Sequence, residues 1–101
     1  MRNNGVEFPT AAIEALCRKW SVVELALFGS VLRADFRPDS DIDVLVTFDP
    51  DAKWDLLDFV ALKEELEAIF RRSVDLVEKP GIRNPIRRKA ILDSQEVLYV
   101  A

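Results

Sequence analysis

Residues 22–48, VVELALFGSVLRADFRPDSDIDVLVTF, decide the fold of this chain. The segment begins and ends with a largely apolar run, 22–28 and 42–48, and each run predicts a buried strand. Gly29 ends the first run, and the turn residues Arg-Pro-Asp-Ser at 37–40 precede the second. The segment therefore predicts two strands of a sheet, joined by a polar connection.

The flanking segments alternate between helical and strand patterns. Apolar residues at i, i+3, i+4 and i+7 predict an amphipathic helix over 10–20, with Thr10 as its candidate N-cap. Asn84 followed by Pro85 is typical of the start of another helix. In total, further helices are predicted over about 30–34, 55–70 and 85–92, and further strands over 74–77 and 96–100. This order predicts an α/β fold of the mixed α+β kind with about four strands.

Length and composition restrict the class of protein. The 101 residues predict a single domain, 1–101, with one modest core. A net charge of −4 argues against bulk binding of nucleic acid, and no apolar run reaches the roughly 18–20 residues of a membrane span. Cys17 is the only cysteine, which excludes an intrachain disulfide and leads us to expect a reducing compartment, the cytoplasm.

Three aspartates are candidate metal ligands. Asp41 and Asp43 open the second predicted strand two residues apart, so their side chains share one face. Two such carboxylates, roughly 6–7 Å apart, repel each other unless a cation lies between them. Asp75 lies inside the apolar strand 74–77, and it completes an acidic triad if that strand is a neighbour of the second. Oxygen ligands fit Mg²⁺, and a triad of this kind is able to hold two metal ions.

Gly29 and Ser30 are candidate phosphate-binding residues because they follow directly after the first predicted strand. Glycine lets a backbone approach a phosphate without interference from a Cβ atom. The amides at the start of a following helix can bind an anion, and the Ser30 hydroxyl adds a donor. Together with the aspartates, this turn predicts a site for nucleotidyl transfer.

Each of these motifs has a more ordinary interpretation when it stands alone. Gly-Ser after a strand is a common turn, and Asp-x-Asp is frequent among solvated loop acids. A phosphatase of the HAD type also uses Asp-x-Asp, but its apolar strand precedes the pair, whereas here the strand follows Asp43. A calcium-binding loop requires more oxygen ligands in one continuous run and a glycine within it. The combination and its spacing therefore favour the nucleotidyl-transfer site.

The sequence also resembles a known family. Gly29-Ser30, ten further residues, and then Asp41-x-Asp43 before an apolar run resemble the signature of the DNA polymerase beta-type nucleotidyltransferase superfamily. Within it, FGSVLRADFRPDSDIDVLV is similar to the minimal nucleotidyltransferase (MNT) proteins, and the resemblance extends to the later VDLV, RNPIR and VLYV segments. It departs at Ala34, where relatives often carry glycine. The resemblance implies a small mixed β-sheet of about four strands flanked by helices.

The resemblance also implies roles for individual residues. Asp41 and Asp43 would bind both of two Mg²⁺ ions. Asp75 would bind the catalytic metal and help to deprotonate the acceptor hydroxyl. The residues implied to hold the triphosphate of ATP or another NTP are Gly29, Ser30, Arg33 and Ser40.

The same resemblance implies a partner. MNT proteins are commonly antitoxins paired with a HEPN-type ribonuclease toxin, and some add AMP groups to that toxin. We therefore expect AMP transfer from ATP to a hydroxyl group, a tyrosine of a HEPN-like partner. Two alternatives stay open: a non-catalytic antitoxin that acts by complex formation, and a small-molecule nucleotidyltransferase of the aminoglycoside type completed by a homodimer or second chain. Trp54, in an acidic linker, is expected to be exposed and indicates a partner surface.

Overall fold

The computed structural model of the protein describes residues 2–101, and its main sheet has four strands in the order β5-β4-β3-β6. β3 pairs antiparallel with both β4 and β6, whereas β4 and β5 run parallel. The sheet is therefore mixed, as predicted. Its strands are β3 (Val22–Phe28), β4 (Ile42–Phe48), β5 (Val74–Glu78) and β6 (Glu96–Val100).

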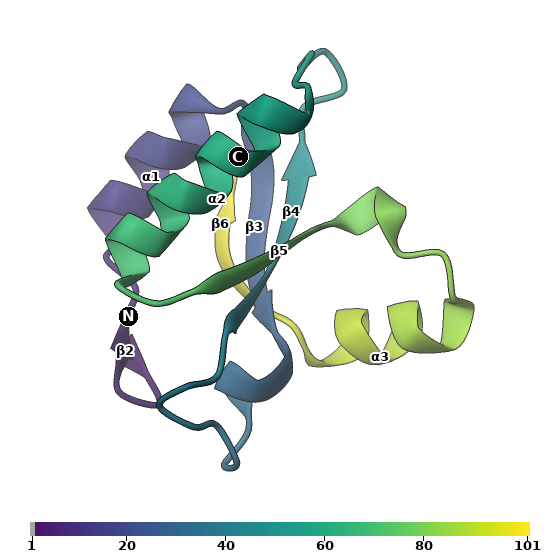
Figure 1. The fold of residues 1–101 in the computed structure, drawn as a ribbon. Coiled ribbons are helices and arrows are strands. Elements are labelled where there is room, and N and C mark those ends of the chain that lie inside the picture. Colours follow the sequence, from purple (N-terminus) through teal and green to yellow (C-terminus); the bar gives the residue numbers. More distant parts are fainter. Residues whose placement is uncertain (1) are drawn as a thin grey trace.

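Helices cover both faces of this sheet. α1 and α2 lie side by side on one face, and α3 lies on the other (Figure 1). The predicted capping residue of α3 is confirmed, since the Asn84 side chain accepts hydrogen bonds from the backbone N–H groups of Ile86 and Arg87. In α2, Asp55 and Asp58 form a capping box. The helices are α1 (Thr10–Lys19), α2 (Leu56–Phe70) and α3 (Pro85–Ser94).

Adjacent residues along the central strands face opposite layers. On β3, Leu27 packs in the core formed with α1 and α2, whereas Phe28 packs in the smaller core beneath α3. The same alternation on β4 places Val44 in the first core and Leu45 in the second. Val77 of β5 also packs on the α3 side. These strands are buried on both faces, which explains why they read as continuous apolar runs.

Three local predictions need correction. Thr10 is the first helical residue of α1 rather than its cap, because Pro9 occupies the N-cap position and makes no side-chain capping bond. The helix predicted over 30–34 is a 3₁₀ turn, η1 (Gly29–Leu32), and a second such turn, η2 (Lys79–Gly81), follows β5. A hairpin of β1 (Arg2–Asn3) and β2 (Val6–Glu7) precedes α1 and was not predicted, because strands of two residues are too short to leave a hydrophobic pattern.

Within residues 2–101, no helix combines the length and apolar character that a bilayer crossing requires.

Candidate functional site

Asp43 and Asp75 lie side by side on neighbouring strands. Their Cα atoms are register partners in the parallel pairing of β4 with β5, and neighbouring strands are about 4.8 Å apart. Leu45 and Val77, each two residues further along, pack on the α3 side of the sheet, so both aspartates face that side. Asp43 is half-buried and Asp75 is exposed. The condition on which the acidic triad depended, that the two strands are neighbours, is met.

Gly29 is the residue that makes room for the Asp43 carboxylate. A Cβ atom at Gly29 would collide with the Asp43 side chain, and the closest atom would be the carboxylate oxygen Oδ2. Gly29 also has a φ of 72°, a left-handed conformation that side chains with a Cβ rarely adopt. The position is therefore restricted to glycine twice, by space and by backbone conformation. The turn after β3 and the start of β4 form one site.

The pKa of Asp43 is shifted by several of the other predicted site residues. Burial is the largest cause that raises its pKa above the ordinary value of 3.8, and the negative charge of Asp75 is the second. A hydrogen bond from the Ser30 backbone lowers the pKa, the charge of Asp41 raises it, and the charge of Arg33 lowers it. Asp43 is thus the centre of the cluster and carries an unfavourable charge in the absence of a cation.

Asp41 lies immediately before β4 and is exposed. The connection that leads to it is braced internally. The Ser40 hydroxyl accepts a hydrogen bond of 3.1 Å from the Arg37 backbone N–H, and Arg33 makes an ion pair of 3.1 Å with Asp35. In this structure Ser40 and Arg33 therefore stabilise the connection, and their predicted contact with a triphosphate stays a prediction.

Asp43 and Asp75 are register partners and Asp41 lies two residues before Asp43, but the three side chains are not gathered around a common point. Among residues 2–101, no group of three acidic, histidine or cysteine side chains is arranged to hold a metal ion. Asp43 takes a hydrogen bond from the Ser30 backbone. The donor set still fits a hard cation, because all of its ligand atoms are carboxylate oxygens.

Sequence reasoning missed two residues that brace the site. The Asn4 side chain donates hydrogen bonds of 2.6 and 2.9 Å to the carbonyl oxygens of Val31 and Arg33, so the β1–β2 hairpin supports η1. Arg72 donates to two carbonyl oxygens in the connection before Asp41. The Asn4-Gly5 pair was the available signal for the hairpin, since this dipeptide is typical of tight turns.

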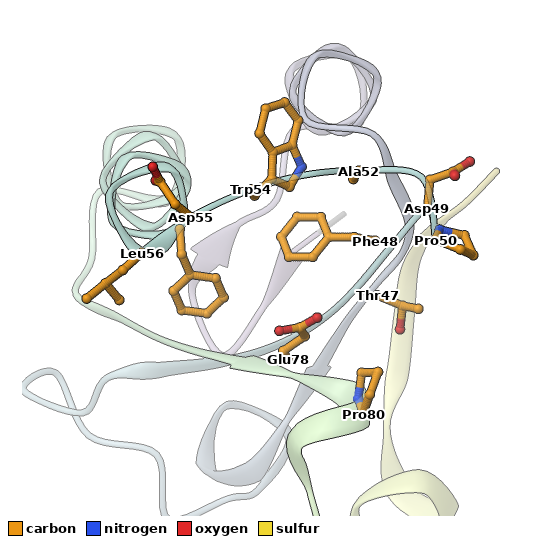
Figure 2. Close-up of a pocket in the computed structure, with 11 residues that line it drawn as sticks. Thr47, Phe48, Asp49, Pro50, Ala52, Trp54, Asp55, Leu56, Glu78 and Pro80 are labelled. Atoms are coloured by element: carbon orange, nitrogen blue, oxygen red, sulfur yellow. The ribbon is translucent and has the colours of Figure 1, made fainter.

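A separate hollow of about 720 Å³ lies near the opposite, carboxyl end of β4. Figure 2 shows that its lining combines the aromatic rings of Phe48 and Trp54 with the acidic residues Asp49, Asp55 and Glu78. Asp49 lies six positions after Asp43, just beyond the end of β4, or roughly 20 Å away along the strand direction. The hollow is therefore not the space between the three aspartates.

Comparison with known proteins places this geometry in context. The family described as "Nucleotidyltransferase domain" matches residues 10–98. The chain is 37% identical over 91 residues to the protein adenylyltransferase MntA of Thermococcus cleftensis, an alignment that covers 90% of this chain and 87% of that protein.

Two solved structures share the fold at lower identity. A toxin–antitoxin complex with AMP-PNP aligns with a TM-score of 0.71 at 21% identity, covering 93% of this chain and 75% of the other. A complex of tri-AMPylated Shewanella oneidensis HEPN toxin with MNT antitoxin aligns with a TM-score of 0.63 at 20% identity, covering 91% and 70%. Both structures share the fold of this chain, and the predicted small mixed sheet flanked by helices is confirmed.

Proposed function

The chain belongs to the nucleotidyltransferase domain family, and on that premise we propose that it transfers AMP from ATP to a hydroxyl group of a partner protein. The observation that carries the proposal is the register pair of Asp43 and Asp75 beside the Gly29 turn. In this proposal, residues 1–101 act as one nucleotidyltransferase domain.

Some of the site residues would bind metal ions, and the others would bind phosphate. Asp41, Asp43 and Asp75 would hold two Mg²⁺ ions, which supply charge neutralisation at the reacting phosphate and at the leaving group. On binding metal, the Asp43 carboxylate would give up the hydrogen bond that it accepts from the Ser30 backbone. The Ser30 amide would then be available for a phosphate oxygen, with Gly29 providing the space for close approach.

The reaction is a substitution at the α-phosphorus of ATP. The acceptor oxygen forms a new bond to that phosphorus, the bond to the bridging oxygen of the β-phosphate breaks, and pyrophosphate leaves. The acceptor hydroxyl must lose its proton as the bond forms, and Asp75, which is the exposed member of the pair, would receive it. Asp43 is half-buried against the Gly29 turn and is therefore less accessible to an incoming hydroxyl group.

A HEPN-type toxin is the proposed acceptor, and a tyrosine is the proposed residue on it. Support comes from the name of the Thermococcus cleftensis relative, a protein adenylyltransferase, and from the AMPylated HEPN toxin in the Shewanella oneidensis complex. The complex with AMP-PNP supports ATP as the nucleotide donor.

The proposal is tested by incubating the protein with ATP, Mg²⁺ and a HEPN-type toxin, followed by intact-mass analysis. We expect the partner to gain mass in whole AMP units. Asp43→Asn and Asp75→Asn should each abolish the gain, whereas Asp51→Asn, an exposed acid beyond the other end of β4, should leave it unchanged. Equal transfer by wild type and Asp43→Asn would refute the assignment of the site.

A second candidate function is neutralisation of a partner by complex formation alone. It is favoured by the apolar surface at the start of α2, where Trp54, Leu56 and Leu57 are 39%, 75% and 78% exposed. In this case Asp43→Asn would still protect cells from the partner, although it transfers no AMP. Loss of protection together with loss of transfer would eliminate this candidate.

A further inference from the structure

We propose that Arg72 is a positioning residue that fixes the backbone carrying Asp41, whose charge acts on Asp43. The inference rests on the proposed function, because the position of Asp41 matters only if the aspartates bind metal. Arg72 lies between the end of α2 and the start of β5, three residues before Asp75. Arg72 therefore precedes the strand that carries Asp75, and its side chain contacts the connection that leads to Asp41.

Three contacts join Arg72 to that connection. Its Nη2 atom donates hydrogen bonds of 3.0 Å to the carbonyl oxygen of Arg37 and 2.7 Å to the carbonyl oxygen of Ser40. Its guanidinium carbon lies 4.7 Å from the centre of the Phe36 ring, which is a cation–π contact. Phe36 itself packs against the core formed with α1 and α2. The guanidinium thus fixes both ends of the 36–40 segment.

The bond to Ser40 acts directly on Asp41. The Ser40 carbonyl belongs to the peptide unit that joins Ser40 to Asp41, so Arg72 fixes the backbone just before the aspartate. On the other side, the Ile42 N–H donates a hydrogen bond of 2.9 Å to the carbonyl of Ser73. Asp41 is outside the β4 ladder, yet it is held on both sides by two consecutive residues that lead into β5.

Arginine suits this place better than lysine does. Its planar guanidinium offers several donors in a fixed arrangement and also stacks on an aromatic ring, whereas an ammonium group presents a single strongly hydrated nitrogen. Because Nη2 already donates to two carbonyl oxygens, Arg72 acts through the backbone of Asp41 rather than on the substrate. Residues that orient metal ligands in this way typically change metal affinity or activity by about 10-fold to 100-fold when they are replaced.

The experiment compares Arg72→Gln with Arg71→Gln. Arg71 is adjacent and exposed, and its side chain makes no hydrogen bond or ion pair within residues 2–101, so its replacement removes the same charge without the contacts. Two readouts are measured for each protein: binding of Mn²⁺ by electron paramagnetic resonance, and the Mg²⁺ dependence of AMP transfer. We expect Arg72→Gln to weaken Mn²⁺ binding and to raise the half-saturating Mg²⁺ concentration by about 10-fold or more. The transfer rate at saturating Mg²⁺ should stay close to that of wild type.

Arg72→Lys should fall between Arg72→Gln and wild type, because it keeps the charge and part of the hydrogen bonding. A purely structural role predicts a different result, in which Arg72→Gln lowers the melting temperature and leaves the metal dependence unchanged. That result, or equal metal dependence in the Arg71 and Arg72 variants, overturns the inference. If wild type itself neither binds Mn²⁺ nor transfers AMP, the proposed function fails and the inference fails with it.

Discussion

Replacement of Asp43 by asparagine should make the protein more stable while it abolishes transfer. Asp43 and Asp75 are register partners on adjacent strands, so their side chains start from Cα atoms roughly 5 Å apart. Two negative charges at that distance repel each other by about 0.8 kcal/mol in water and about 3 kcal/mol at an effective dielectric constant of 20. Since Asp75 is exposed, we expect the lower part of this range, about 1 kcal/mol, to be recovered in Asp43→Asn.

The assay is thermal unfolding at neutral pH without divalent cations. For a domain of this size, 1 kcal/mol corresponds to a rise in melting temperature of roughly 4–8 °C. Asparagine keeps an oxygen that can accept the hydrogen bond from the Ser30 backbone, so this interaction is retained. Asp51→Asn is the matched control, because it removes one exposed negative charge at the other end of β4 and should change the melting temperature little.

The pH dependence follows from the raised pKa of Asp43. Burial and the charge of Asp75 make ionised Asp43 costly, so this group lowers stability above the carboxyl range and the cost disappears as the pH falls and Asp43 is protonated. The advantage of Asp43→Asn should therefore shrink toward acid pH. Added Mg²⁺ should also reduce it by stabilising wild type. A variant less stable than wild type at neutral pH would show that the two carboxylates do not repel each other.

Three further outcomes are expected. Gly29→Ala should lower the melting temperature and abolish AMP transfer, because its Cβ atom would collide with Asp43 at a φ of 72°; unchanged transfer would contradict the close contact. Cys17 should resist thiol reagents until the protein unfolds, since burial raises the pKa of its thiol from 9.0 to about 12. The free energy of unfolding should therefore fall as the pH rises above about 9, because the thiol then ionises in the unfolded chain but stays neutral in the folded protein. Asn84→Ala should cost about 0.5–2 kcal/mol in chemical denaturation, because the first turn of α3 loses its side-chain cap.

The sequence predicted the central strands and the three main helices because their signals are local. The apolar runs of 22–28 and 42–48 correspond to β3 and β4, since both strands are buried on two faces. The Asn84-Pro85 pair marked the start of α3 for an equally local reason. The predictions that failed, at Thr10 and over 30–34, concern the ends and detailed geometry of elements. Those features depend on individual backbone angles rather than on hydrophobic spacing.

In the candidate site, too, some features follow from spacing along the sequence and others only from tertiary packing. The spacing of Gly29, Asp41 and Asp43 along the chain was sufficient to indicate a nucleotidyl-transfer site and the family to which the chain belongs. The pairing of Asp43 with Asp75 depends on the parallel register of β4 and β5, which α2 separates in sequence. The support of Asp41 by Arg72 likewise joins residues 31 positions apart. Spacing along the chain fixes which side chains can share a strand face, but only tertiary packing decides which strands become neighbours and which distant side chain secures a loop.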